Sequence, residues 1–252
     1  MHVLKFFRSL PILFVPFFLL CGEERFESEI YWKGSDQKDP VFIYKNAADT
    51  VDGRRVLGHY YYKPDGPLFA SEELFLGEDG QWQKHVIDFP VLEERSVMLN
   101  KGDEVELRFH KEGNTKSRTR ELQEPLLFGP VQQEFVRKNL QALKSGEKIY
   151  FYLPAAEFGL LVQFKMEKTD DTPYGSPGAF VVVMSTKSFI LSWFLGDSYF
   201  VLDKEDATIL EIHGSSVLKQ QVDGKWEYID VDIDMEYTEP EKDSRSSAAG
   251  AE

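Results

Sequence analysis

The sequence predicts a mainly β protein with one or two helices, in which a helix covers a curved antiparallel sheet or incomplete barrel. Turn signals recur along the chain, among them Asp52-Gly53, Glu112-Gly113 and Asp223-Gly224. The runs between such turns have the length of strands and are rich in aromatic and β-branched residues, as in "RRVLGHYYY" and "EVELRFH". Short strands joined by turns of this kind are typical of an antiparallel meander.

The first 20 residues have the profile of a signal peptide. Lys5 and Arg8 precede an unbroken apolar run from Leu10 to Leu20, and no acidic residue occurs before Glu23. A helix over this run would extend roughly 16 Å, which is about half of the hydrocarbon core of a bilayer. We therefore expect an export signal rather than a transmembrane helix.

The single cysteine of the chain, Cys21, directly follows the apolar run and precedes the small residue Gly22. This junction resembles the lipobox of bacterial lipoproteins in an atypical, spirochaete-like form, with Leu20 where a small residue is usual. The resemblance implies that Cys21 becomes the lipidated first residue of the mature chain. Two or three acyl chains would attach it stably to a membrane. The alternative is a plain secretory signal followed by an unmodified cysteine.

Composition divides the remaining chain into three parts. We expect residues 21–29 to form a lipidated acidic tether, residues 30–237 a single β-rich domain, and residues 238–252 a disordered tail without large apolar side chains. A hydrophobic content of 42% is sufficient for a buried core. The formal net charge of −14 argues against nucleic-acid binding, because nucleic acids select basic surfaces.

One stretch of the domain is basic. In "NTKSRTREL" the alternate residues Lys116, Arg118 and Arg120 would lie on one face of a strand. A solvated face is the simplest interpretation of this pattern. It is also a local cluster of positive charge in an acidic chain, so it is a candidate site for an anion or a lipid headgroup.

A helix is expected after Gly129-Pro130 and should end at Gly146, because proline is favoured in the first helical turn and glycine just after the last. Its apolar residues, which include Phe135, Val136 and Leu140, fall within one half of the helical wheel. An apolar face of this breadth is suited to covering a sheet.

The run Lys187 to Leu195, "KSFILSWFL", fits a second helix or a strand equally well. Its large apolar side chains, Phe189, Trp193 and Phe194 among them, must be covered by other parts of the protein. They are expected to belong to the core or, alternatively, to line or close an apolar cavity.

No metal site is expected. Asp230, Asp232 and Asp234 alternate as in part of a calcium-binding loop, but Met235 occupies the place that needs glycine. The pattern favours a strand with one solvated acidic face. Four histidines without metal-ligand spacing are expected in a half-solvated sheet: His59, His85, His110 and His213.

No motif supports catalysis or a cofactor. Ser215 in "HGSS" lacks the following glycine of a nucleophile elbow, and no phosphate-binding loop or dinucleotide fingerprint occurs. Four glutamates that could form a glycosidase pair are expected at the solvated surface: Glu72, Glu73, Glu93 and Glu94. We therefore expect a non-enzymatic protein.

The second half of the domain follows a recognisable order: a helix, the strand "KIYFYLP", and later "YFVLDKEDATILEIHGSS" with a short Asp-Gly turn and a last strand ending in Tyr237. Over residues 125–237 this order resembles a group of uncharacterised exported bacterial proteins whose expected architecture is similar to the lipoprotein-localisation factors LolA and LolB. The resemblance implies an incomplete antiparallel barrel with helices across its open side and a lipophilic ligand.

The leading hypothesis is a non-enzymatic, lipid-anchored protein of the bacterial cell envelope that binds an acyl chain or another amphiphile, with the outer membrane favoured over the inner as its location. Phe135, Val136, Leu140, Phe189, Trp193 and Phe194 would line or close its cavity. One alternative is a surface-exposed lipoprotein that binds a protein of unknown identity. Another is a hydrolase of envelope glycans or lipids, because active sites can form without short motifs.

Overall fold

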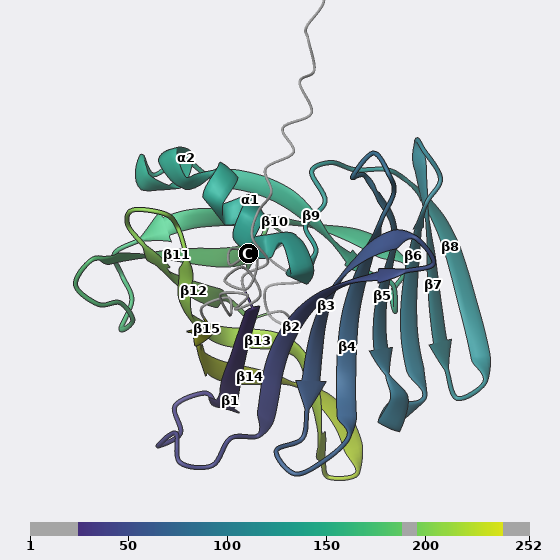
Figure 1. Ribbon diagram of the computed structural model, residues 1–252, viewed down its shortest axis with the longest axis horizontal. Helices are drawn as coiled ribbons and strands as arrows, with labels where there is room; N and C mark the ends of the chain where they lie inside the picture. The colour runs from purple at the N-terminus through teal and green to yellow at the C-terminus, as the bar shows by residue number, and fades with distance from the viewer. Residues whose placement is uncertain (1–24, 188–195, 239–252) are drawn as a thin grey trace, which may run out of the picture.

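β1 (Arg25–Trp32) lies in the interior of one continuous antiparallel sheet, although it comes first in the chain. The structure, a computed structural model, describes residues 25–187 and 196–238. Within these ranges the sheet has 15 strands in the order β8-β7-β6-β5-β4-β3-β2-β1-β14-β13-β12-β11-β10-β9, and β15 also pairs with β1 (Figure 1). The predicted curved antiparallel sheet with a helical cover is confirmed.

The first half of the sheet is a meander in which each strand pairs with the next. The strands are β2 (Phe42–Val51), β3 (Arg54–Tyr62), β4 (Leu68–Leu76), β5 (Trp82–Phe89), β6 (Glu94–Asn100), β7 (Glu104–Lys111) and β8 (Asn114–Glu121), with the short helix η1 (Pro90–Leu92) before β6. Asp52 and Gly53 both have positive φ angles, 52° and 75°, as do Glu112 and Gly113. These are the type I′ geometries that the Asp-Gly and Glu-Gly signals favour.

The second half continues the antiparallel pairing on the other side of β1. Its strands are β9 (Ile149–Ala155), β10 (Leu160–Thr169), β11 (Ala179–Thr186), β12 (Ser198–Asp203), β13 (Ile209–Val222), β14 (Lys225–Asp234) and β15 (Tyr237–Thr238). β1 joins the two halves, because Ile30 pairs with Phe42 of β2 and with Ile233 of β14.

The sheet curls so that its two edge strands, β8 and β9, approach each other. The segment that follows β8 runs beside β9, where Leu127 N donates to Tyr152 O over 3.0 Å and Tyr152 N donates to Pro125 O over 2.9 Å. Leu161 of β10 packs with Leu107 of β7 in one apolar cluster. This segment supplies hydrogen-bond partners for backbone groups at the exposed edge of β9. In an open sheet these backbone groups would lack such partners.

The predicted helix is present but is divided in two. η2 (Gly129–Val131) leads into α1 (Gln132–Lys138), and α2 (Leu140–Lys144) follows. The break is at Asn139, whose side-chain amide donates to the Phe135 carbonyl over 2.8 Å. Side-chain to backbone bonds of this kind compete with the helical ladder. No helix in the described ranges is long and apolar enough to cross a membrane.

The helices cover the inner face of the second half of the sheet (Figure 1). Val136, Leu140 and Leu143 are buried against inward-facing residues of β9 to β13, such as Phe151 and Phe200. The spacing of these three residues places them on one side of the helical segment. The charged face of the segment is left in solvent, as the sequence pattern predicts.

The long β13–β14 hairpin crosses the end of the curled sheet opposite α1 (Figure 1). Its Trp226 ring lies 6.1 Å from that of Phe69 on β4. Lys219 forms an ion pair with Glu94 of β6, and the Tyr228 hydroxyl donates to Glu157 over 3.2 Å. The hairpin therefore links strands that are far apart in the sheet.

Two expected boundaries differ from the structure. Residues 25–29, expected in the acidic tether, belong to β1, because β2 and β15 supply backbone partners for this segment. Thr238, expected in the tail, is the last residue of β15. Residues 1–24 and 239–252 lie outside the described ranges.

Candidate ligand-binding cavities

The interior of the curled sheet contains a cavity of about 190 Å³, here called the inner cavity. It lies between the start of α1 and the β13–β14 hairpin. Most of its wall is apolar and comes from both halves of the sheet, including Ile30, Leu127, Leu153, Met184, Phe200, Ile212, Leu218, Val231 and Ile233. An engineered apolar cavity of about 150 Å³ is large enough to hold benzene. The inner cavity therefore has room for part of a small molecule.

A second cavity of about 150 Å³, the outer cavity, lies beside η2 and the first turn of α1. Five residues line both cavities: Tyr44, His59, Gly129, Gln132 and Ile212. The outer cavity is also lined by Arg55, Leu57 and Met235. The two cavities are therefore adjacent, with these five residues where they adjoin.

The side chains of β3 alternate between the two faces of the sheet, and those on the inner face form part of the cavity walls. Arg55, Leu57, His59 and Tyr61 are successive inward-facing residues of this strand, and all four line one or both cavities. Tyr61 pairs in register with Tyr44 of β2, and the two rings stack 4.9 Å apart. Charge lies near the β2–β3 turn, and aromatic residues lie deeper.

Tyr44 and His59 form a buried hydrogen-bonded pair. The Tyr44 hydroxyl lies 2.8 Å from Nδ1 of His59. Burial lowers the pKa of His59 to about 4 and raises the pKa of Tyr44, so both groups are neutral near pH 7. When Tyr44 donates to Nδ1, the remaining imidazole proton is on Nε2.

Nε2 of His59 borders open space. Every fully buried side-chain nitrogen or oxygen in the described ranges has a hydrogen-bond partner. Among the described residues His59 is hydrogen-bonded through Nδ1 alone, and its side chain lines both cavities. His59 can therefore donate a hydrogen bond to a ligand in one of the cavities.

Glu72 and His85 form a second buried pair in the wall of the inner cavity. His85 Nε2 lies 2.8 Å from Glu72 Oε1, which also accepts the Gly129 N–H over 2.9 Å. Burial acts to raise the pKa of Glu72, but the hydrogen bond and charge of His85, the charge of His59 and the Gly129 N–H together hold it below its usual value. The inner cavity thus has an ionised carboxylate in its wall.

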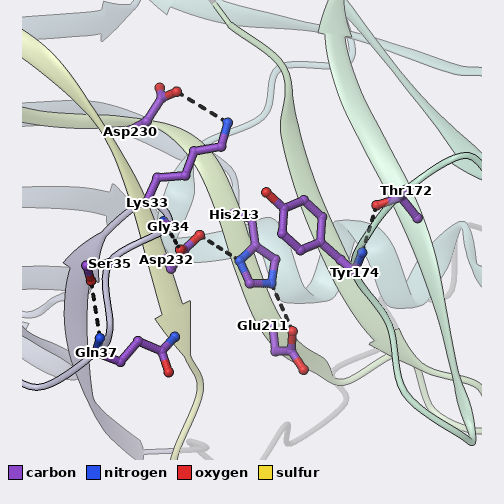
Figure 2. A network of polar contacts seen from close by, with 10 residues as sticks. All are labelled: Lys33, Gly34, Ser35, Gln37, Thr172, Tyr174, Glu211, His213, Asp230 and Asp232. Atoms are coloured by element: carbon purple, nitrogen blue, oxygen red, sulfur yellow. Dashed lines mark hydrogen bonds and ion pairs between the residues drawn. The ribbon is translucent and has the colours of Figure 1, made fainter.

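A separate polar network lies on the outer face of β13 and β14 (Figure 2). The two ring nitrogens of His213 lie 2.8 Å from Asp232 Oδ1 and 2.8 Å from Glu211 Oε2. Asp232 also accepts the Gly34 N–H over 2.7 Å, and Tyr174 stacks on the imidazole. All these polar groups already have partners, so the network fastens two loops to the sheet.

The predicted cavity residues on the helix lie elsewhere. Val136 and Leu140 are buried in the packed cluster beneath the helices, and the Phe135 ring contacts that of Phe151 at 5.2 Å between centroids. The helical segment contributes to the cavities through its first residues instead, including Gly129 and Gln132. Phe189, Trp193 and Phe194, like Cys21, lie outside the described residues.

The basic cluster lies on edge strand β8, where Lys116, Arg118 and Arg120 pair in register with inward-facing residues of β7. Lys116 and Arg118 are exposed and Arg120 is half-buried. The Arg118 side chain lies against Gly159, in the turn between β9 and β10. The three basic residues therefore share one face of the strand, as expected. They lie where the two edges of the sheet approach each other, and they line neither cavity.

The interpretation of the histidines and glutamates as solvated residues was wrong at several positions. His59, His85, His213, Glu72 and Glu94 are between 2% and 9% exposed. Each has a partner on a neighbouring strand or across the barrel, so its burial depends on register and curvature. The only local sequence signal is their position among apolar residues on inward-facing or covered faces.

The acidic alternation on β14 is present, but its outer face is not uniformly solvated. Asp230 is exposed, whereas Asp232 is 7% exposed. The loops that contain Gly34 and Tyr174 bring partners over this face. In the described ranges, no group of three or more His, Cys, Asp or Glu residues has an arrangement that could hold a metal ion.

These features define a curled antiparallel β-sheet protein with two adjacent cavities, an architecture compatible with ligand binding. No protein-family profile and no curated protein matches the chain. Among solved structures, it is similar to the crystal structure of a β-barrel-like protein of domain of unknown function DUF1849 from Brucella abortus. The identity is 8% and the TM-score 0.45, over 85% of this chain and 95% of that chain.

Proposed function

We propose that the protein binds a lipophilic ligand inside the curled sheet and performs no catalysis. The observation that carries this proposal is the pair of cavities with shared walls. Ligand sites are typically concave and mostly apolar, with a few fixed polar groups. Ile30, Phe200 and Ile233 supply apolar wall, and the neutral Tyr44–His59 pair supplies a fixed polar group.

The size of the cavities restricts the ligand. Each is smaller than the roughly 300–1,000 Å³ of common small-molecule pockets, whereas an occupant of both would approach the lower end of that range. A slender molecule such as a single acyl chain meets this restriction better than a bulky ring system. An acyl chain or similar amphiphile is therefore the proposed ligand class.

The location of the protein is part of the proposal. A lipid on Cys21 would hold the mature chain at the bacterial cell envelope, with the outer membrane favoured over the inner. The segment before β1 would then connect the anchor to the middle of the sheet, because β1 pairs with both β2 and β14. A binding protein in this position could take up or deliver an amphiphile at a membrane surface.

Native mass spectrometry of the purified full-length chain, followed by solvent extraction, tests whether an amphiphile is bound. Ile212→Phe would fill space in both cavities, because Ile212 lines both. Leu210→Phe is the matched control, since Leu210 is on the same strand and packs with the outer-face cluster. We expect Ile212→Phe to lose the ligand and Leu210→Phe to keep it. A wild-type protein that carries no amphiphile and takes up none would refute the proposal.

A further inference from the structure

The outer cavity contains a cation at the end nearest the β2–β3 turn. Arg55 lines this cavity, is exposed, and faces inward on the same side of β3 as Leu57 and His59. No described residue forms an ion pair or hydrogen bond with its guanidinium. A guanidinium offers five N–H donors in a geometry that matches carboxylate and phosphate groups.

The other charges around the outer cavity have neighbours of their own. Glu134 forms an ion pair with Lys138 at 2.7 Å. Arg137 donates from Nε to the Asp206 carbonyl over 3.3 Å. The negative charge in the lining is thus already matched, and Arg55 adds a positive charge that the lining does not balance.

The inner cavity has the opposite polarity. Its wall holds the Glu72 carboxylate, which is 6% exposed and is fixed by His85 and Gly129. An anionic group placed there would be repelled by this carboxylate and would lose its hydration. An apolar chain would meet Ile30, Phe200 and other apolar wall residues instead.

We propose that the ligand is an anionic amphiphile, bound with its charged end at Arg55 in the outer cavity and its chain past His59 into the inner cavity. This inference rests on the proposed function and adds the charge of the ligand and its direction. Leu57, between Arg55 and His59 on the inward face of β3, contacts the first part of the chain. The anionic end is a carboxylate or a phosphate, since Arg55 suits both.

The test compares four probes with the same dodecyl chain, below their micelle concentrations: dodecanoate, dodecyl phosphate, dodecanol and dodecylamine. Affinities are measured by calorimetry on the full-length chain and on three variants. Arg55→Gln removes the charge and Arg55→Lys retains it. Arg54→Gln is the matched control, because Arg54 is exposed on the opposite face of the same strand.

We expect the wild type to bind at least one anionic probe more tightly than dodecanol. Arg55→Gln should weaken that binding by about threefold to tenfold, the order expected for one partly exposed charge-assisted contact. Dodecanol binding should not change, Arg55→Lys should recover much of the loss, and Arg54→Gln should resemble the wild type. The comparison of carboxylate with phosphate identifies the preferred anion.

Two results would overturn the proposal, and they differ in meaning. Equal binding of charged and neutral probes, unaffected by Arg55→Gln, would refute the role of Arg55 but leave a lipophilic cavity. Binding of none of the four probes would refute both this inference and the proposed function.

Discussion

The Tyr174 ring lies parallel to the His213 imidazole, with 3.9 Å between ring centroids and 4° between planes (Figure 2). Tyr174 belongs to the loop between β10 and β11, and His213 belongs to β13. The Tyr174 ring also packs beside Tyr199 of β12. The contact therefore ties a surface loop to two strands that are distant from it in sequence.

Replacing Tyr174 with alanine should loosen this loop without unfolding the sheet. A stacked ring pair contributes about 0.5–1.5 kcal/mol, and Tyr174 stacks on His213 and packs beside Tyr199. We expect faster amide hydrogen exchange in residues 170–178 and a small fall in the free energy of unfolding. Tyr174→Phe retains the stacked ring and should behave like the wild type. Unchanged exchange in the alanine variant would contradict the assigned role.

The buried His59 should make stability depend on pH. Its pKa is about 4 in the folded protein and 6.5 in an unfolded chain, because burial disfavours the imidazolium. Between these values the unfolded chain binds the proton more readily, so the folded state is destabilised as pH falls. The contribution of neutral His59 to the free energy of unfolding is fully present above pH 6.5. About 3 kcal/mol of this contribution is lost by pH 4.

Urea unfolding at pH 7 and pH 4.5 would measure this effect. His59→Gln removes the titrating group, so its free energy of unfolding should fall less between these pH values than that of the wild type. His110→Gln is the control, because His110 is only half-buried. Equal pH dependence in the wild type and His59→Gln would show that His59 is not the group responsible.

Glu72→Ala should destabilise the fold by about 3 kcal/mol, since each buried donor left without an acceptor costs about 1–3 kcal/mol. The substitution removes the acceptor of both His85 Nε2 and the Gly129 N–H. Glu73→Ala is the control on the opposite face of β4, where the Glu73 carboxylate accepts one bond from Tyr60 over 3.2 Å. Chemical denaturation of both variants tests the difference, and similar losses would argue against the Glu72 network.

The ion pair between Glu94 and Lys219 should be sensitive to loss of one partner. Glu94 also accepts a hydrogen bond from Lys111 over 2.7 Å, and Lys219 lies 4.7 Å from the Tyr228 ring. Burial acts to raise the pKa of Glu94, but the two lysines hold it below its usual value. Glu94→Ala leaves Lys219 buried without its carboxylate and should cost about 3 kcal/mol.

A double substitution separates this cost from simple loss of packing. Glu94→Leu combined with Lys219→Met replaces both charges with apolar groups of similar volume, which is often close to neutral. We expect the melting temperature of the double variant to be closer to that of the wild type than the melting temperature of Glu94→Ala is. If Glu94→Ala melts at the same temperature as the wild type, the pair does not stabilise the hairpin.

Cys21→Ala should release the mature chain from membranes. Lipidation would attach acyl chains through the Cys21 sulfur, and each buried methylene contributes about 0.8 kcal/mol to membrane binding. Metabolic labelling with an alkyne analogue of palmitate, followed by membrane fractionation, measures both attachment and location. The wild type should be labelled and sediment with membranes. An unlabelled wild type would support the plain secretory signal instead.

Local sequence rules predicted the strands and turns well. Asp52-Gly53 and Asp223-Gly224 form turns with positive φ because glycine and aspartate tolerate that conformation. The apolar spacing of Val136 and Leu140 predicted which side of the helix is buried. The break at Asn139 was not predicted, because it depends on one side-chain hydrogen bond.

The candidate site was much less predictable, since it depends on which distant strands meet. His59 faces Glu72 and Asn46 only because of the register of β3 with β4 and β2. Nothing local distinguishes Glu72 from Glu73, yet one is buried in a cavity wall and the other faces the opposite side. The pairing of β1 with β14 across nearly the whole chain was likewise not contained in any short motif.

That pairing has a consequence for how the molecule folds. The backbone of Ile30 meets that of Ile233 only after every other strand of the sheet except β15 has been synthesised. Contacts of such long sequence separation are slow to form, because the intervening chain must lose conformational entropy first. Until then β1 and β14 each have an unpaired edge that other chains can bind. We expect refolding in vitro to be slow and concentration-sensitive, and newly synthesised chains to need a holdase until the last strands emerge.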